Sequence, residues 1–210
     1  MVKRWFLLLW LLCLVSLPAA ADAASLVEPQ IGFSAERTLV VDGHTYQGKI
    51  WAMPGKERHE QTIQGLRPIF LLRADRPLAE IVVASIKTIV QLEMPPQLRL
   101  LDRGRLKQRP VGRDTVNGVA TTKYAIDEAV SEGHAKGLLW FSRDDIPMRA
   151  DGTFIDPKGK VTTVRWELSN VKIGPQPAAL FEPPQGYSKL PPEAVAPLLG
   201  LKLKPARQAN

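Results

Sequence analysis

The sequence predicts a mainly β protein with one domain, built as a sandwich or a barrel. About ten to eleven short segments alternate apolar and polar residues as strands do, and turn signals separate them at intervals of about 8–12 residues. Few segments favour helix, and those are short. No shift in composition marks a domain boundary and no internal repeat is visible, so a single domain is the default interpretation.

The strongest strand signals lie between Ile31 and Glu60, where Asp42-Gly43 separates two alternating segments. Asp-Gly favours a tight hairpin turn because that turn needs positive φ, which glycine adopts without strain. One face of the first strand is apolar except for Arg37. A buried charge must be paired, reach the rim of the sheet or meet a ligand. The neighbours of this arginine on that face are Ile31, Phe33, Ala35, Leu39 and Val41.

Further strands are predicted in the segment that follows. The first, Lys56 to Ile63, is polar, which is typical of an exposed or edge strand. The later ones contain many β-branched residues, so we favour a hairpin over the alternative of a helix across residues 78–94. These later strands are Pro68–Ala74, Leu78–Val83 and Thr88–Met94.

A basic segment, Arg99 to Arg113, interrupts the strand pattern, and a short helix over residues 96–102 overlaps its start. We interpret the segment as a mobile connection or an ordinary exposed loop. The pattern then resumes, with a second hairpin signal at Asn117-Gly118. The strands expected here are 113–116, 119–127, 137–143, 148–155 and 160–168, the last extended by 171–174; a short helix, 192–199, and a disordered tail, 201–210, follow.

The first 23 residues have the features of a Sec signal peptide. A positively charged start precedes an apolar run from Trp5 to Leu17, and small residues allow cleavage at Ala21 or Ala23. The run is short for a membrane span, which makes an uncleaved anchor the less favoured alternative. We therefore expect a soluble periplasmic protein whose β domain covers residues 24–200.

Cysteine content and charge limit the possible partners. Cys13 is the single cysteine and lies in the leader, so the exported domain has no thiol for a disulfide or a metal site. The formal charge is +7. Because an exported protein rarely meets nucleic acid, we expect the basic surface to face anionic lipids or an acidic envelope protein, or to be simply solvated. We expect a monomer.

A series of short motifs occurs along the chain in a recognisable order. They are Phe33-Ser34-Ala35-Glu36-Arg37, Gly48-Lys49-Ile50-Trp51, Pro54-Gly55-Lys56-Glu57-Arg58, Gly118-Val119-Ala120-Thr121-Thr122-Lys123-Tyr124, Gly137-Leu138-Leu139-Trp140-Phe141-Ser142, Ile146-Pro147-Met148-Arg149 and Leu180-Phe181-Glu182-Pro183-Pro184-Gln185-Gly186-Tyr187. This succession resembles periplasmic proteins of the LolA/LolB-like superfamily, in particular a branch with a PGKER segment and a terminal FxxPxGY signature. The motifs are turn and strand markers, so they are specific for fold and weak for function.

The resemblance implies a single, strongly curved antiparallel sheet, an unclosed half-barrel wrapped over a few short helices. In carriers of this superfamily the cavity between sheet and helices takes lipoprotein acyl chains, and an inward-facing strand arginine occurs, to which Arg37 is the nearest match by context. This chain departs from the pattern because no helix precedes its first strand. The resemblance thus implies a lipid or another hydrophobic ligand more strongly than lipoprotein transport itself.

A curved sheet with few helices leaves part of its concave face uncovered, which predicts an apolar groove. For any single aromatic residue a packed core is the better expectation. Arg37 and Arg73 either hold an anionic head group at the mouth of the groove or pair with carboxylates. The candidate ligand-binding residues are Phe33, Arg37, Trp51, Phe70, Leu72, Arg73, Tyr124, Trp140, Trp166 and Phe181.

Catalytic signals are weak. The histidines, His44, His59 and His134, lack the spacing of a metal site, and no nucleophile elbow, phosphate loop or dinucleotide motif occurs. We therefore predict no enzyme, no metal and no cofactor. The expected function is binding of lipid or lipoprotein acyl chains as a carrier, chaperone or sensor. The alternatives are an envelope-sensing module that binds a membrane protein through the 56–63 edge, and a hydrolase.

Overall fold

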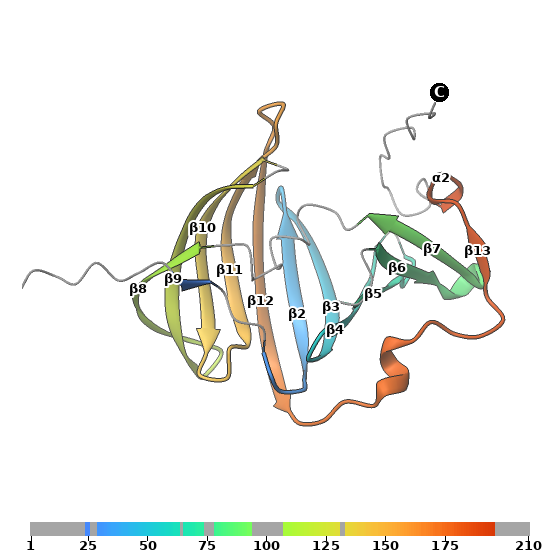
Figure 1. The fold of residues 1–210 in the computed structure, drawn as a ribbon, viewed down its shortest axis with the longest axis horizontal. Coiled ribbons are helices and arrows are strands. Elements are labelled where there is room, and N and C mark those ends of the chain that lie inside the picture. The colour runs from blue at the N-terminus through green and yellow to red at the C-terminus, as the bar shows by residue number, and fades with distance from the viewer. Residues whose placement is uncertain are drawn as a thin grey trace, which may run out of the picture.

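The computed structural model describes residues 24–25, 29–63, 65–73, 78–93, 107–130 and 133–195. Thirteen strands within these ranges form one sheet, in the order β1-β8-β9-β10-β11-β12-β2-β3-β4-β5-β6-β7-β13 (Figure 1). Their bounds are β1 Ala24–Ser25, β2 Phe33–Val41, β3 His44–Met53, β4 Lys56–Gln61, β5 Ile69–Arg73, β6 Leu78–Val83, β7 Thr88–Glu93, β8 Lys107–Val116, β9 Val119–Val130, β10 Gly133–Ser142, β11 Pro147–Ile155, β12 Val161–Ile173 and β13 Ser188–Leu190.

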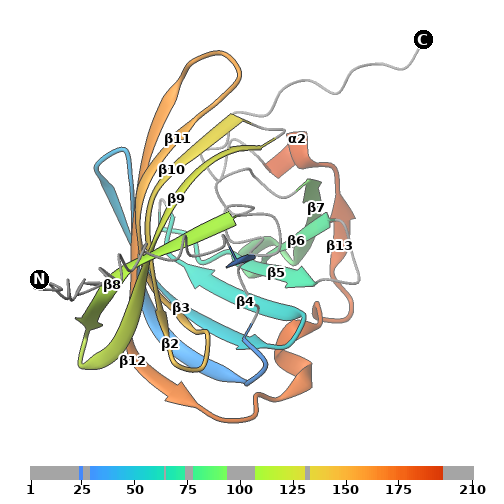
Figure 2. The same cartoon turned by 60° about the vertical axis from the view of Figure 1, so that its left-hand side comes forward.

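The sheet is strongly curved and unclosed, as predicted. Every pair of these strands is antiparallel except β13 with β7. The sheet curls so that β9–β12 form one wall, β2–β4 the bend and β5–β7 the facing wall (Figure 2). Helical structure among the described residues is short: η1 (Ala84–Ile86), η3 (Ala178–Phe181) and α2 (Pro192–Val195). The prediction of a mainly β half-barrel is therefore confirmed.

Two tight turns set the register of the hairpins β2–β3 and β8–β9. Asp42 and Gly43 have φ of 48° and 81°, and Asn117 and Gly118 have φ of 48° and 80°. Positive φ at both central residues defines the type I′ turn, whose twist matches that of paired strands. The first turn places Val41 opposite its strand partner His44. Both of these predicted hairpins are confirmed, as is the hairpin favoured over a helix across residues 78–94, since β6 pairs with β7.

The concave face of the sheet holds most of the core. Direct cross-strand partners lie on the same face, and the rows of partners across β12, β2, β3 and β4 include Trp166 with Leu39 and Ile50 with His59. Burial of this face removes apolar surface from water, the main driving force for folding. A cluster of buried apolar residues lies here. Its members on β2, β3 and β12 are Phe33, Ala35, Ile50, Ala52, Trp166 and Leu168.

The prediction that Lys56 to Ile63 forms an edge strand is wrong. Strand β4 pairs with β3 on one side and with β5 on the other. Its polar side chains are tolerated in the interior of the sheet because they pair with one another: His59 contacts Glu57 on the inner face, and Arg58 contacts Glu60 on the outer face. A charged sequence is therefore compatible with a central strand when alternate residues are complementary.

The basic segment is partly a strand. Residues 107–113 belong to β8, which pairs with β9, so they are not a loop. The rest of that segment lies outside the described residues, as do the helix predicted over 96–102, the leader 1–23, the tail 201–210 and the end of the 192–199 helix. Within the described ranges, no helix is long and apolar enough to cross a membrane.

A C-terminal strap, residues 174–190, links β12 to the far end of the sheet. Phe181 is fully buried, and Arg58 of β4 donates a hydrogen bond to the carbonyl oxygen of Leu180 at 2.9 Å. Glu182 forms ion pairs with Lys56 at 3.1 Å and with Arg73 at 2.5 Å. The strap ends in β13, which pairs in parallel with β7 and so covers the edge of that strand.

Candidate functional site

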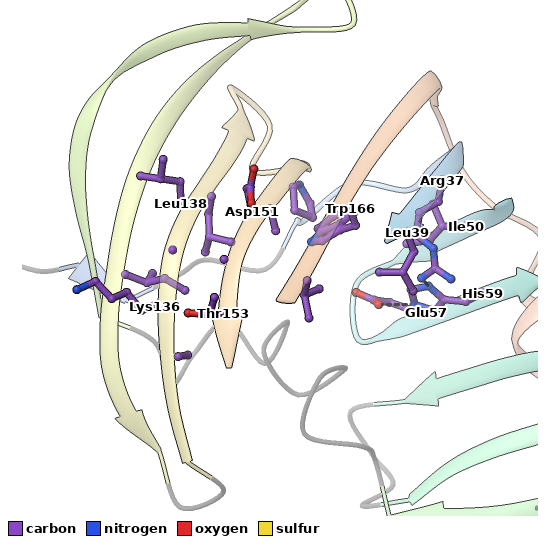
Figure 3. Close-up of a pocket in the computed structure, with 18 residues that line it drawn as sticks. Arg37, Leu39, Ile50, Glu57, His59, Lys136, Leu138, Asp151, Thr153 and Trp166 are labelled. Atoms are coloured by element: carbon purple, nitrogen blue, oxygen red, sulfur yellow. Dashed lines mark hydrogen bonds and ion pairs between the residues drawn. The ribbon is translucent and has the colours of Figure 1, made fainter. Parts of the chain in front are cut away.

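A pocket opens on the concave face between the wall β9–β12 and the bend of β2–β4 (Figure 3). Its floor contains very small residues: Gly137 and Gly152 are direct cross-strand partners, and Ala135 and Ala150 lie on the same two strands. A Cβ atom on Gly137 would lie 2.6 Å from the Cα of Gly152, so only glycine fits there. The floor at this point is bare backbone.

Larger apolar side chains surround this floor. They are Leu39, Ile50, Ile126, Leu139, Val164 and Trp166. Four further residues border the pocket: Lys136, Leu138, Asp151 and Thr153. Because they alternate with the inward-facing residues of β10 and β11, they belong to the opposite face of these strands. The resulting surface is mostly apolar and suits a hydrocarbon group.

The volume open to the centre of a water-sized molecule is about 60 Å³. A pocket of this size holds a short stretch of one hydrocarbon chain. Burying about four methylene groups of a ligand would contribute about 3 kcal/mol, at about 0.8 kcal/mol per group. The pocket therefore suits a single narrow chain, with the rest of a long ligand lying along the concave face.

Arg37 borders the pocket and reaches across a neighbouring strand. It lies opposite Gly48 on β3, which in turn lies opposite Gln61 on β4. Its guanidinium passes this glycine, and Nη2 donates a hydrogen bond to Oε1 of Gln61 at 2.5 Å. A Cβ atom at position 48 would lie 2.1 Å from the carbonyl oxygen of Glu60. Glycine at this position thus permits both the close strand packing and the path of the arginine.

His59 connects the arginine to a carboxylate (Figure 3). Nη1 of Arg37 lies 2.5 Å from Nδ1 of His59. Arginine has no acceptor, so Nδ1 accepts this bond and the ring carries its proton on Nε2. Nε2 then donates to Oε2 of Glu57 at 2.9 Å. We refer to Arg37, Gln61, His59 and Glu57 as the Arg37 network.

Burial is the dominant electrostatic influence on Arg37. It lowers the pKa of the guanidinium to about 10, against the smaller opposing effect of the Glu57 charge. The Nε atom of Arg37 is buried and has no hydrogen-bond partner among the described residues. The cation is therefore held in a desolvated position with one donor unused.

Arg73 lies on the opposite face of the sheet and is neutralised differently. Its direct partner on β4 is Lys56, whereas Glu57 faces Leu72. The guanidinium of Arg73 pairs with two carboxylates, those of Glu80 and Glu182. Of the two arginines singled out from the sequence, Arg37 thus borders the cavity, and Arg73 forms ion pairs on the outer face.

The structure brings only some of the predicted groove residues to the pocket. Arg37 and Trp166 border it. The cross-strand partners of Phe70, Leu72 and Tyr124 place these three on the concave face, outside the pocket lining. Phe33 also lies on the concave face outside the pocket lining, buried at one end of β2. The others lie elsewhere: Trp51 lies under Arg58, Trp140 lies between Lys123 and Arg149, Arg73 is on the outer face, and Phe181 is in the strap.

Trp140 illustrates how the outer face is covered. Its indole donates a hydrogen bond to Asp114 of β8 at 3.0 Å. The turn between β8 and β9 also reaches the outer side of β12, where the side-chain amide of Asn117 donates to Glu167 and to the carbonyl oxygen of Leu168. This hairpin thus folds back over the sheet and encloses the indole, which accounts for a buried tryptophan that does not border the pocket.

Sequence reasoning missed the small residues of the floor and the partners of Arg37. Gly137 and Gly152 were visible as glycines inside predicted strands, which often mark a close backbone approach. Their direct pairing depends on the register between β10 and β11. Strand alternation places His59 and Glu57 on one face of β4, and the structure shows them in contact there.

The other polar residues are engaged in structural contacts. His134 pairs with Asp127 at 2.6 Å, and His44 is exposed at the start of β3. Ser142 Oγ accepts hydrogen bonds from the backbone N–H groups of Asp144 and Ile146. The described residues include no group of three or more potential metal ligands. The arrangement around the pocket is suited to binding.

Comparison with solved structures agrees with this architecture. An uncharacterized conserved protein from Thermus thermophilus superposes with a TM-score of 0.51 at 14% identity, over 77% of this chain and 91% of that one. The two proteins therefore share a fold. At this identity the likeness concerns the fold alone.

Weaker structural similarity links this chain to two other proteins. MucB, solved in complex with MucA(peri), gives a TM-score of 0.46 at 20% identity over 75% of this chain; the match spans 56% of the MucB chain. The lipoprotein LppX of Mycobacterium tuberculosis gives 0.39 at 12% identity, over 66% of this chain and 85% of LppX. No protein-family model and no curated protein matches the sequence.

Proposed function

We propose that this protein binds a hydrophobic chain, the acyl chain of a lipid or lipoprotein, in the concave pocket. The observation that carries the proposal is an apolar pocket whose floor is bare backbone at Gly137 and Gly152. A sheet that packed only against itself would fill this position with side chains, as protein interiors do. The protein would act as a carrier, chaperone or sensor and would have no catalytic role.

The proposed mechanism is transfer of a chain between two apolar phases. The chain leaves a membrane or a donor protein and enters a pocket that is already formed, so little conformational entropy is lost by the protein. The formal charge of +7 favours approach to anionic membrane surfaces. The signal-peptide features of the first 23 residues lead us to propose the periplasm as the compartment.

Lipid extraction of the purified protein, followed by mass spectrometry, tests the proposal directly. We expect co-purified acyl lipids, and we expect a fluorescent fatty acid to bind to the delipidated protein. Ala150→Phe should fill the pocket floor and reduce that binding about tenfold or more, because several buried methylene groups lose their site. The matched control is Ala129→Phe, at an exposed position on β9.

The fatty-acid affinities of the two variants can be compared directly when the melting temperature of each is within a few degrees of that of the parent. Binding that is equal in Ala150→Phe and Ala129→Phe would place the chain outside this pocket. Absence of bound lipid together with absence of fatty-acid binding would contradict the proposal as a whole.

A second candidate function is binding of an envelope membrane protein. Its route through residues 56–63 is lost because β4 is central. Strand β8 offers another edge: β1 pairs only with Lys107 and Gln108, and residues 109–115 are exposed, including Val111. A partner strand could extend the sheet there. Cross-linking to a membrane protein from the exposed position 109 on β8, abolished by Val111→Pro, would favour this candidate over lipid binding.

A further inference from the structure

The two buried arginines of the sheet differ in what neutralises them. Both are 5% exposed. Arg73 makes direct ion pairs with two carboxylates. Arg37 makes hydrogen bonds to neutral acceptors, the imidazole of His59 and the amide oxygen of Gln61. A buried guanidinium is normally paired with an anion in direct contact, because desolvation of the charge is expensive. Arg73 follows that rule. Arg37 is connected to a carboxylate, that of Glu57, through the intervening ring of His59.

The unused donor of Arg37 is on a defined edge of the guanidinium. Nε–H points toward the side that carries Nη2, away from the Nη1 that contacts His59. This is the edge that binds a carboxylate side-on in two-point pairs. Nε is buried and lacks a hydrogen-bond partner among the described residues, and Arg37 borders the apolar pocket. An unsatisfied, buried, charged donor next to an apolar pocket is a specific recognition element.

The other charged residues that border the pocket do not offer an equivalent site. Lys136 has a side chain that is 69% exposed and pairs with Asp127 at 3.3 Å. Glu57 is bonded to the far nitrogen of His59, and its negative charge disfavours a dianion close by. The site combines one cation, one nearby carboxylate and a pocket of about 60 Å³. A ligand with a single negative charge and a narrow apolar chain fits this combination.

We propose that the pocket binds a long-chain carboxylic acid, with the carboxylate on the Nε edge of Arg37 and the hydrocarbon chain over the glycine floor. This inference rests on the proposed function, which it narrows from acyl chains in general to single-chain carboxylates. His59 and Gln61 act as positioning residues, since they hold Nη1 and Nη2 of the guanidinium and leave Nε without a partner among the described residues. Burial of the cation favours the same outcome, because it makes an added anion more strongly attractive.

The test uses ligands with one chain length and different heads. Calorimetric titration of the delipidated full chain at pH 7.5 would compare dodecanoate, 1-dodecanol and dodecyl phosphate. We expect dodecanoate to bind about 10- to 100-fold more tightly than 1-dodecanol, the range of one charge-assisted hydrogen-bonded contact. We expect Arg37→Gln to reduce dodecanoate affinity to that of 1-dodecanol and to leave 1-dodecanol unchanged. Arg165→Gln, which removes an exposed arginine on the outer face, is the matched control.

The outcomes distinguish this inference from the proposed function. Equal binding of dodecanoate and 1-dodecanol to the parent protein would overturn the carboxylate site and leave chain binding intact, and this comparison needs no variant to fold. Tighter binding of dodecyl phosphate than of dodecanoate would also overturn it, in favour of a phosphate head. Binding of none of the three would contradict the proposed function itself. A loss in Arg165→Gln equal to that in Arg37→Gln would assign the effect to general surface charge.

Discussion

Replacing His59 by leucine should expose how tightly Arg37 depends on its neutral partners. His59 is 2% exposed and accepts the bond from Nη1 of Arg37. Leucine leaves part of a buried guanidinium without an acceptor, and breaking such a buried contact costs about 3 kcal/mol. The double variant Arg37→Leu/His59→Leu removes the stranded charge as well. We expect it to be at least as stable as His59→Leu alone, because replacing both partners by apolar groups is close to neutral.

Urea denaturation monitored by tryptophan fluorescence measures these differences. With a slope of about 2 kcal/mol per molar urea, a loss of about 3 kcal/mol lowers the midpoint by about 1.5 M. The exposed ion pair of Arg165 and Asp151 serves as the control cycle, since an exposed pair should show a coupling energy of at most about 1 kcal/mol. A double variant whose destabilisation equals the sum of the Arg37→Leu and His59→Leu effects would refute the reasoning, because it would mean that the two residues do not interact.

Three further predictions concern the strap and the strand packing. Phe181→Ala should cost about 3–5 kcal/mol of unfolding free energy in urea, because Phe181 is fully buried; a loss below about 1 kcal/mol would show that the strap packs loosely. A hydrogen bond from Lys56, together with the nearby charge of Arg73, lowers the pKa of Glu182, so its stabilising effect is present above the usual pKa of 4.5 and is lost as the pH falls below it. The melting temperature of the parent should therefore fall more between pH 6 and pH 3 than that of Glu182→Gln, and equal falls would contradict this. Gly48→Val should prevent the close approach of β3 to β4. In the same urea assay it should destabilise the protein by more than Gly43→Val, which strains a turn residue with a φ of 81° but has nothing within 4 Å of the added Cβ.

Local features of the fold were predictable from the sequence. The turns at Asp42-Gly43 and Asn117-Gly118 depend on the conformations that two adjacent residues adopt, and both occur as predicted. The place of Arg37 on an apolar face follows from strand alternation alone. These are properties of single strands or single turns, for which the sequence holds the necessary information.

Properties that depend on pairing between distant strands were not predictable. The segment from Lys56 to Gln61 has the composition of an edge, yet β5 pairs along it and makes it central. The partners of Arg37 come from β4, which lies two strands away from β2 across β3. The register between strands decides both, and residue composition does not encode it.

The choice of aromatic residues as groove candidates carries a physical lesson. Large side chains fill space, so most of the predicted aromatics lie in packed regions: Phe33 and Phe181 are fully buried, and Trp140 is enclosed on the outer face. The pocket arises where side chains are small or missing, over Gly137 and Gly152. A search for cavities in a β sequence should therefore look for small residues that register places opposite one another.

The paired glycines also restrict how this pocket can diverge. Any side chain at position 137 would collide with the carbonyl oxygen of Asp151 at 2.5 Å, so the strands would have to separate before the floor could be raised. Single substitutions of Gly137 or Gly152 thus cannot make the pocket gradually shallower. Gradual adaptation to a longer, shorter or wider ligand must proceed through the surrounding side chains, such as Ile126, Leu139 and Trp166, and relatives with different ligands should differ there while keeping the glycine pair.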